Sequence, residues 1–206
     1  MFGGKNNMNE SYDLWEMHEG THLYSLSAVY AAFKAMIKIE KELDKGSDIQ
    51  ELEENAEKVK DFCLRNFINS DNTLKRNNKD NICDISLLGT VIPFNMLNEF
   101  QNEIKNTIEK INLNLRTYTG GYIRFENDSY LGGNNPWPIA TLWMALYNSK
   151  IGNNEEARAQ IDFIIKTATK HGFLAEQVDN ETMQSKWVIG LGWSHAMYII
   201  ALSAIA

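Results

Sequence analysis

The sequence predicts an all-α protein, on three observations. Apolar residues recur at steps of three and four over several long segments, which is the period of an amphipathic helix. Strand-like segments at regular spacing are missing from the sequence, which disfavours an all-β fold or a parallel α/β sheet. The predicted helices alternate with loops that carry unusual strings, among them DLWE and FLAEQVD. Helical hairpins with such loops at one end suggest a toroid.

The first two predicted helices form a hairpin. One runs from His22 to about Leu43, with an apolar stripe that comprises Leu23, Leu26, Val29, Tyr30, Phe33, Met36 and Ile37. The second runs from Ile49 to Phe67, and Asp48 directly before it is a residue type that caps helix N-termini.

A polar stretch separates this hairpin from the remaining helices. Residues 69–84 are rich in Asn and Asp and predict a loop or a short ribbon. Residues 86–94 are apolar but include Pro93 near their end, which predicts a short buried element. Four more long helices are expected, at residues 98–111, 138–147, 154–170 and 191–205.

Composition narrows the class of protein. With 206 residues and 44% hydrophobic content, the chain is expected to fold as a single domain over residues 1–206. The net charge of -7 disfavours nucleic acid as a partner, because a phosphate backbone requires a basic face. The start of the chain has no apolar core of the kind found in signal peptides, and no later run is long enough to span a bilayer. We therefore expect a cytoplasmic protein without a membrane contact.

No metal or cofactor site is predicted. Cys63 and Cys83 lack partners at ligand spacing, so they are expected to be buried free thiols. His18 and His22 are one helical turn apart but have no third ligand. His195 follows Ser194 directly, and neighbours in sequence do not face each other on a helix, so His195 is expected to be structural.

The densest motif is Tyr12-Asp13-Leu14-Trp15-Glu16, followed by Gly20 and a Ser-rich apolar helix. Acidic residues ahead of a helix also serve as caps or complement the helix dipole, so the motif alone leaves a structural role open. The string resembles the segment that carries the catalytic acid in glycoside hydrolase family 15, the glucoamylase-like six-hairpin glycosidases. The resemblance implies that Glu16 is the general acid, and that Asp13 and Trp15 bind substrate and favour the protonated acid.

The segment FLAEQVD resembles the carboxy-terminal motif in which a Glu before a Gln is the general base. The resemblance implies this role for Glu176, and a solvated acid in a loop before a helix is the structural alternative. The segment GGYIRFENDSYLGGNNPWP resembles the family's Arg-bearing loop and its Asn-Pro-Trp helix start. It implies that Arg124 anchors sugar hydroxyls and that Trp137 stacks on a sugar. The alternatives are a salt bridge from Arg124 to Glu126 or Asp128, and a core position for Trp137.

The resemblance covers Tyr12 to Ala206 and implies an inverting hydrolase of terminal α-glucosidic bonds that needs no cofactor. The family's catalytic domain is an (α/α)6 toroid of twelve helices, of which about six or seven are expected here. The chain is therefore expected to be the carboxy-terminal part of the barrel, as a fragment, a split-gene product or the result of a misassigned start. We expect it to be inactive unless a complementary half-barrel or self-association completes it.

Met17 stands where many relatives have a second substrate-contacting Glu, so trehalose and isomalto-linked glucans are alternative substrates to starch-like α-1,4 glucans. A non-catalytic carbohydrate-binding regulatory domain and an inactive fragment are the remaining alternatives.

Overall fold

The structure is a computed structural model, and it describes residues 9–43, 46 and 48–205. Residues 1–8, on which the prediction about a signal peptide depends, lie outside the described residues. The chain divides into two compact units. Unit 1 comprises Met1–Ile82 and Gly89–Thr107, and unit 2 comprises Cys83–Leu88 and Ile108–Ala206. The expectation of a single domain over residues 1–206 stays a prediction.

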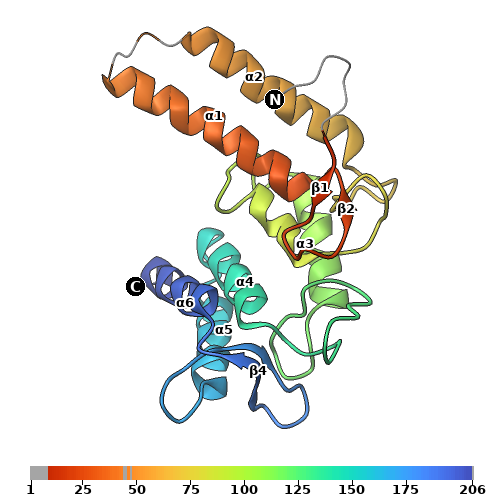
Figure 1. Cartoon of the computed structure of the whole chain (residues 1–206), viewed down its shortest axis with the longest axis vertical. Helices are drawn as coiled ribbons and strands as arrows, with labels where there is room; N and C mark the ends of the chain where they lie inside the picture. The colour runs from red at the N-terminus through yellow and green to blue at the C-terminus, as the bar shows by residue number, and fades with distance from the viewer. Residues whose placement is uncertain (1–8, 44–45, 47, 206) are drawn as a thin grey trace. The chain divides into compact units, whose positions relative to one another are not determined.

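Unit 1 is built on the predicted helical hairpin. Helices α1 (Leu23–Leu43) and α2 (Ile49–Asn66) lie side by side (Figure 1). The Asp48 side chain accepts a hydrogen bond from the Glu51 N–H, which confirms Asp48 as the N-cap of α2. Two short strands precede α1, β1 (Ser11–Tyr12) and β2 (Glu19–Gly20), and they pair in antiparallel fashion.

Two elements cross the division between the units. The apolar stretch near Pro93 contains the 3-10 helix η1 (Ile85–Thr90), in agreement with the predicted short buried element. Helix α3 (Asn102–Asn114) begins four residues later than predicted, because Asn98 and Gln101 make a turn. In that turn the Gln101 N–H donates to the Asn98 carbonyl, and the Asn98 side chain accepts from the Phe100 N–H.

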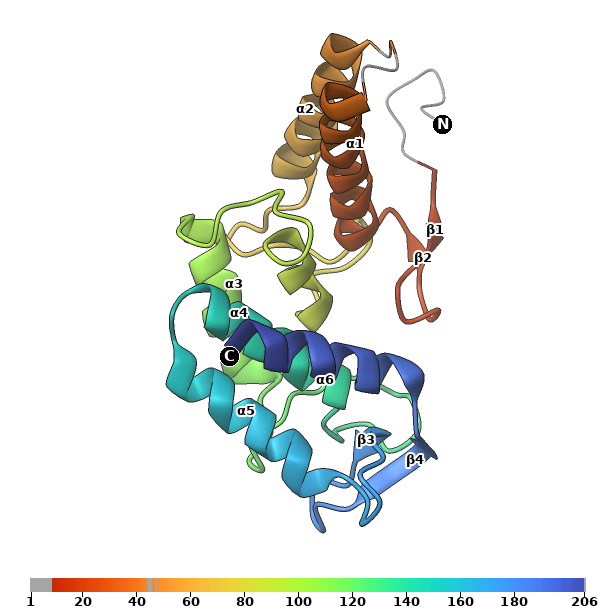
Figure 2. The same cartoon turned by 90° about the vertical axis from the view of Figure 1, so that its left-hand side faces the viewer.

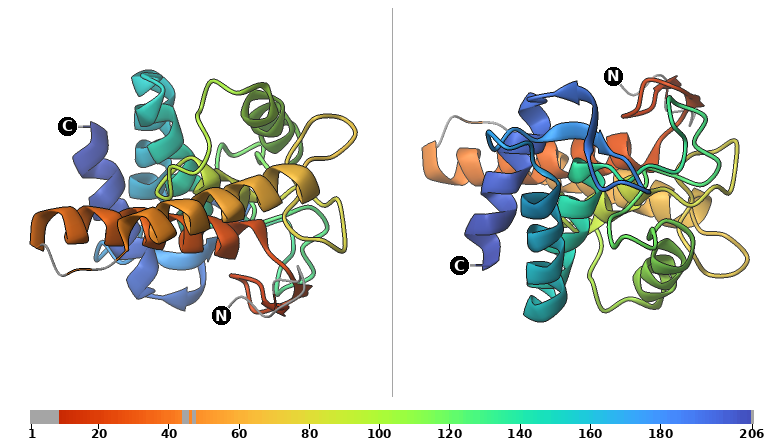
Figure 3. Two further views of the ribbon diagram at one scale, coloured as in Figure 1. Left: turned by 90° about the horizontal axis from the view of Figure 1, so that it is seen from above. Right: turned by 90° about the horizontal axis from the view of Figure 1, so that it is seen from below.

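Unit 2 is organised around helix α4 (Pro138–Lys150), whose residues 138–148 are all buried. Helices α5 (Asn154–Thr167) and α6 (Gly192–Ile205) pack against α4 (Figure 2). The antiparallel hairpin of β3 (Ala175–Val178) and β4 (Ser185–Ile189) leads from α5 into α6 (Figure 3). The FLAEQVD segment was expected to be a loop, and this was wrong, because its central residues pair with β4 across a bulge.

The described residues thus contain six α-helices and one 3-10 helix, with only short strands. The all-α class and the helix count of a partial six-hairpin toroid are confirmed by this architecture and by the structural comparisons below. No helix in the described part of the chain is both long and apolar enough to cross a membrane. Cys63 and Cys83 are free and buried, as predicted, and burial raises the pKa of the Cys63 thiol to about 12.

Candidate active site

Glu16 stands in the loop that joins β1 to β2 in unit 1. The Asp13 N–H donates to the His18 carbonyl at 2.9 Å, and the Glu16 N–H donates to the Asp13 carbonyl at 3.0 Å. These two bonds close a tight loop in which Glu16 takes the left-handed backbone conformation, with φ 57. The Glu16 side chain is exposed, whereas the neighbouring Trp15 is 7% exposed and anchors the loop.

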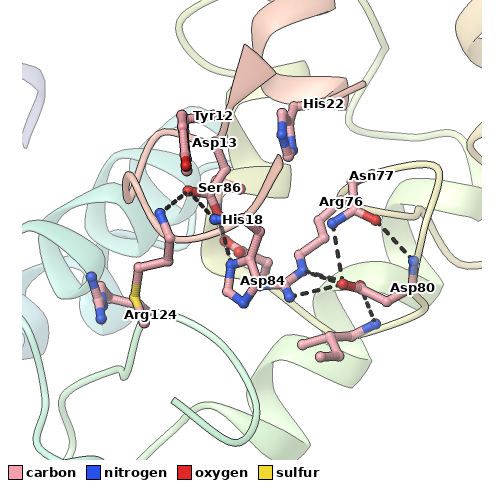
Figure 4. Close-up of polar contacts among 12 residues, drawn as sticks. Tyr12, Asp13, His18, His22, Arg76, Asn77, Asp80, Asp84, Ser86 and Arg124 are labelled. Atoms are coloured by element: carbon pink, nitrogen blue, oxygen red, sulfur yellow. Dashed lines mark hydrogen bonds and ion pairs between the residues drawn. The ribbon is translucent and has the colours of Figure 1, made fainter. Parts of the chain in front are cut away.

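The Asp13 carboxylate is turned into this loop. Its Oδ1 accepts from the Met17 N–H at 2.8 Å, and its Oδ2 lies 2.9 Å from the His18 Nδ1 (Figure 4). The Asp13 side chain is only 7% exposed. Contacts within the loop therefore use both carboxylate oxygens of Asp13, the residue predicted to bind substrate.

A second loop in unit 1, residues 76–80, is hydrogen-bonded to the segment that joins β2 to α1. Arg76 donates through Nε and Nη2 to Asp80, and the Asn77 side chain donates to the same carboxylate (Figure 4). Burial raises the pKa of Asp80, but hydrogen bonds from Arg76, the Ile82 N–H and Asn77 outweigh it, so this pKa lies below its ordinary value.

This loop connects directly to the start of α1. The Leu23 N–H donates to the Arg76 carbonyl, and the Thr21 N–H donates to the Asn78 side chain. No role was predicted from the sequence for Arg76, Asn78 or Asp80. The Asn- and Asp-rich composition of the segment is the signal that could have found them, because such side chains cap their own loops.

Arg124 lies at the centre of a buried cluster in unit 2. Its Nε and Nη2 each donate to Asp128 at 2.8 Å, and both side chains are at most 4% exposed. The guanidinium carbon lies 4.2 Å from the centre of the Trp137 ring and 4.9 Å from that of Tyr130. Of the two ion-pair partners left open by the sequence, the structure selects Asp128.

Glu126, the other partner considered for Arg124, is bound elsewhere. Its carboxylate accepts hydrogen bonds from the Cys83 N–H and from the Asn114 side chain. Asp128, Tyr130 and Phe125, whose ring centre lies 5.2 Å from the guanidinium carbon, are members of the Arg124 cluster for which no binding role was predicted. A planar guanidinium packed on aromatic rings is held in one orientation, which suits directional recognition of hydroxyl groups.

Trp137 is the N-cap residue of α4, and Pro138 follows at the first helical position, as the sequence predicts. The Trp137 ring is 2% exposed, which agrees with the alternative of a core position. The preceding residue connects this helix start to β3, because the Val178 N–H donates to the Pro136 carbonyl. The buried Asn135 side chain also donates to the Gln177 side chain.

Glu176 therefore lies in a strand that is tied to the start of α4. It is half-buried, between the buried residues Ala175 and Gln177, at the irregularity in the β3–β4 register. On β4 this irregularity contains Trp187, whose backbone is left-handed with φ 63. The Glu176 Oε2 is buried and has no hydrogen-bond partner among the described residues. A buried polar atom without a protein partner is unusual in a folded protein, so this oxygen is able to accept a hydrogen bond from a water molecule or a ligand.

The residues near Glu176 on α6 have structural roles. The His195 Nε2 accepts a hydrogen bond from the Leu174 N–H at 3.0 Å, and the Ser194 hydroxyl donates to the Ala175 carbonyl. Both contacts fix the strand that carries Glu176, so the prediction of a structural His195 is confirmed. No group of three or more potential metal ligands is found within the described ranges.

Unit 2 thus holds three predicted site residues: Arg124 and Trp137 are in contact, and Glu176 lies on the strand that is bonded to the residues just before Trp137. Unit 1 holds Asp13, Trp15 and Glu16 in one loop. Residues 4–156 of the chain match the glycosyl hydrolases family 15. The chain belongs to this family. The match includes Glu16, Arg124 and Trp137, whereas Glu176 lies beyond its end.

Relatives of this family extend the likeness over nearly the whole chain. An uncharacterized glycosyl hydrolase of Methanocaldococcus jannaschii is 28% identical over 94% of this chain and 34% of its own length. Trehalase 2 of Sulfolobus acidocaldarius is 26% identical over 86% of this chain and 31% of its own. The chain therefore spans about a third of the length of the curated relatives it matches.

Solved structures show the same fold. A glycosidase aligns with a TM-score of 0.83 at 21% identity, over 94% of this chain and 54% of that chain. The glucoamylase from Saccharomycopsis fibuligera aligns with a TM-score of 0.77 at 16% identity, over 96% of this chain and 57% of that chain. The present chain corresponds to about half of each of these folds.

Proposed function

We propose that this chain contributes both catalytic carboxyl groups to an inverting hydrolase of α-glucosidic bonds. Glu16 donates a proton to the glycosidic oxygen as the bond from that oxygen to the anomeric carbon breaks. Glu176 removes a proton from a water molecule that attacks the anomeric carbon from the opposite face. The proton balance closes when Glu176 loses its proton to solvent and Glu16 regains one, and the product is β-glucose.

The observation that carries this proposal is the buried Oε2 of Glu176, for which the described part of the chain offers no hydrogen-bond partner. Burying a carboxylate oxygen without a hydrogen-bond partner costs free energy. A bound water molecule that donates a hydrogen bond to this oxygen, and is then deprotonated by it, would supply the partner. An inverting mechanism requires its two carboxyl groups to lie about 6.5 to 9.5 Å apart, which leaves room for that water.

For the binding residues, we propose that the Arg124 cluster forms one wall of the sugar site. The double hydrogen bond to Asp128 and the aromatic rings of Tyr130 and Trp137 fix the guanidinium plane. A fixed donor plane discriminates among sugar hydroxyls without a further loss of side-chain entropy on binding. Asp13 and Trp15 act on the acid side, as parts of the loop that presents Glu16.

Terminal α-glucosidic bonds of oligo- and polysaccharides are the substrates that the motifs imply, and trehalose is the second candidate. The second is favoured by the relatives, because two of them are trehalases of Sulfolobus acidocaldarius, at 26% and 24% identity. A structural neighbour solved in complex with glucose supports a glucosyl unit in either case.

The test is glucose release from trehalose, maltose and maltoheptaose, with the anomer of the first product followed by proton NMR. We expect the first glucose released from maltoheptaose to be β-glucose. From trehalose, β- and α-glucose should appear in equal amounts, because the departing glucose keeps its α configuration. Initial release of α-glucose alone from either substrate would contradict the inverting mechanism. Binding of the sugars without turnover in any preparation would instead favour a non-catalytic carbohydrate-binding domain.

We also propose that the active form contains a second helical half-barrel. Helix α6 has no Asp, Glu, Lys or Arg, yet only Ser194 and Ala201 are buried on it. A helix that is apolar on all sides is normally enclosed by protein or lipid, and fourteen residues are too few to span a bilayer. Several large apolar side chains of α6 are exposed, namely Trp193, Ile199, Ile200 and Leu202.

The proposed occupant of this surface is the part of the family fold that the chain does not span, rather than a second copy. The neighbouring folds contain nearly as much additional chain as the part matched here, and two copies would each bring a net charge of -7. Mixing this chain with a separately expressed amino-terminal half-barrel should give a 1:1 complex by analytical ultracentrifugation and restore glucose release. A stable homodimer that excludes the added half would overturn this choice of partner.

A further inference from the structure

The loop between β1 and β2 contains a histidine that the proposed mechanism does not use. His18 lies two residues after Glu16, its side chain is 35% exposed, and its Nδ1 lies 2.9 Å from the Asp13 Oδ2 (Figure 4). The other histidine of this region has a different task, because the His22 Nε2 contacts the Ser11 carbonyl and His22 is buried.

Glu16 occupies a backbone conformation that it would not choose by itself. A left-handed backbone is unfavourable for a residue with a Cβ atom, and it persists only where the surrounding structure enforces it. Two backbone bonds close the loop, as described above, but neither involves the N–H that directly follows Glu16. That group belongs to Met17, and it donates to the Asp13 Oδ1.

Asp13 therefore connects His18 to the backbone of Glu16. One carboxylate oxygen holds the Met17 N–H, and the other holds the His18 imidazole. If the imidazole contact were lost, the Asp13 carboxylate would be held only through Oδ1, by the Met17 N–H at 2.8 Å and the His18 N–H at 3.4 Å. The Met17 N–H would then have a less firmly fixed acceptor, which weakens the restraint on the peptide between Glu16 and Met17.

We propose that His18 is a positioning residue, which through Asp13 and the Met17 N–H holds Glu16 in its left-handed conformation. This proposal deepens the proposed function, because it rests on Glu16 as the acid. Its consequence for turnover is specific. A catalytic group displaced by about 1 Å can cost about 100-fold in rate, whereas the proposed sugar-binding residues of the Arg124 cluster are not part of this loop.

The test compares two substitutions of His18. In His18→Asn the side-chain amide nitrogen takes the place of Nδ1, so the hydrogen bond to Asp13 is kept. In His18→Ala it is lost. We expect His18→Ala to lower kcat about 10- to 100-fold with little change in KM, and His18→Asn to restore most of kcat. His171→Ala, at an exposed histidine of unit 2, is the matched control and should leave both constants unchanged.

An NMR measurement decides the structural step without any activity. In the unmodified chain and in His18→Asn, the Met17 amide should be protected from hydrogen exchange. In both proteins the intraresidue Hα–HN NOE of Glu16 should be strong, because these two protons lie close together in a left-handed residue. Both signatures should weaken in His18→Ala, while urea unfolding shows that the variant remains folded.

The outcomes separate the two proposals. Unchanged Met17 protection and Glu16 NOE in His18→Ala would overturn the positioning role, and so would equal losses of kcat in both His18 variants. If the NMR changes occur as expected but the complete enzyme does not hydrolyse any glucoside, the proposed function fails and the loop mechanism stands.

Discussion

The two candidate catalytic glutamates are held in opposite ways. Glu16 is exposed in a tight turn, and the bonds that shape this turn come from residues within the loop itself. Glu176 is half-buried in a strand whose position depends on three other elements, α4, β4 and α6. One site therefore depends on local loop chemistry and the other on tertiary packing. The variants below separate these two dependences.

The largest effect is expected for Glu176→Gln. The attacking water loses its base, so hydrolysis should fall about 100- to 10,000-fold, for trehalose or maltose and for 4-nitrophenyl α-glucoside alike. Steady-state kinetics on both kinds of substrate measures the loss. Glu181→Gln, at an exposed acid of the β3–β4 connection, is the matched control and should retain normal rates. Full activity of Glu176→Gln would remove this residue from the mechanism.

A more selective loss is expected for Glu16→Gln. A sugar leaving group needs a proton, so its hydrolysis should fall by a factor similar to that for Glu176→Gln, whereas nitrophenolate departs without one and should be much less affected. The ratio of the two rates, measured beside Glu19→Gln in the same hairpin, isolates the acid role. Equal losses on both substrates would mean that Glu16 is not the proton donor.

Stability should respond most strongly in the unit that carries Glu176. Asp128→Asn removes one partner of a buried ion pair and leaves the Arg124 charge uncompensated, which should lower the free energy of unfolding by about 3 to 5 kcal/mol. Urea unfolding followed by tryptophan fluorescence measures this change. Asp162→Asn, at an exposed acid of α5, should change the stability little. A change below about 1 kcal/mol for Asp128→Asn would show that the ion pair of Arg124 and Asp128 does not stabilise the fold.

The smallest effect on stability is expected for Asp80, in the loop of residues 76–80, and it depends on pH. Because the folded-state pKa of Asp80 lies below its ordinary value of 3.8, its contribution to stability is present above that value and is lost as the pH falls through the folded-state pKa. Asp80→Asn should therefore be less stable than the unmodified chain at pH 7, and the difference should shrink below about pH 4.

Urea unfolding from pH 7 to pH 3 measures this difference. Asp61→Asn, which removes an exposed ion pair with Arg65, is the control and should show little change at any pH. A deficit of Asp80→Asn that stays constant down to pH 3 would contradict the assignment.

The sequence by itself determined the helices and the class of fold. The apolar periods of α1, α2, α5 and α6 are properties of short segments, as are the Asp48 cap and the proline at the start of α4, so local pattern was sufficient to predict them. The family resemblance was also visible in the sequence, because it rests on the YDLWE string and on the segment around Arg124. The family match includes both.

Only the tertiary structure decided how the site is held. The AEQV segment became a strand because β4, several residues later, offered it a partner, and strand pairing is not a property of the segment itself. The choice of Asp128 over Glu126 for Arg124 follows from burial and from the rings of Tyr130 and Trp137. Likewise, the contact between the Asp13 and His18 side chains requires the loop to close, because side chains five residues apart meet in a loop only when the backbone between them turns back. Residue identity fixed what these groups can do, and long-range packing fixed which of them meet.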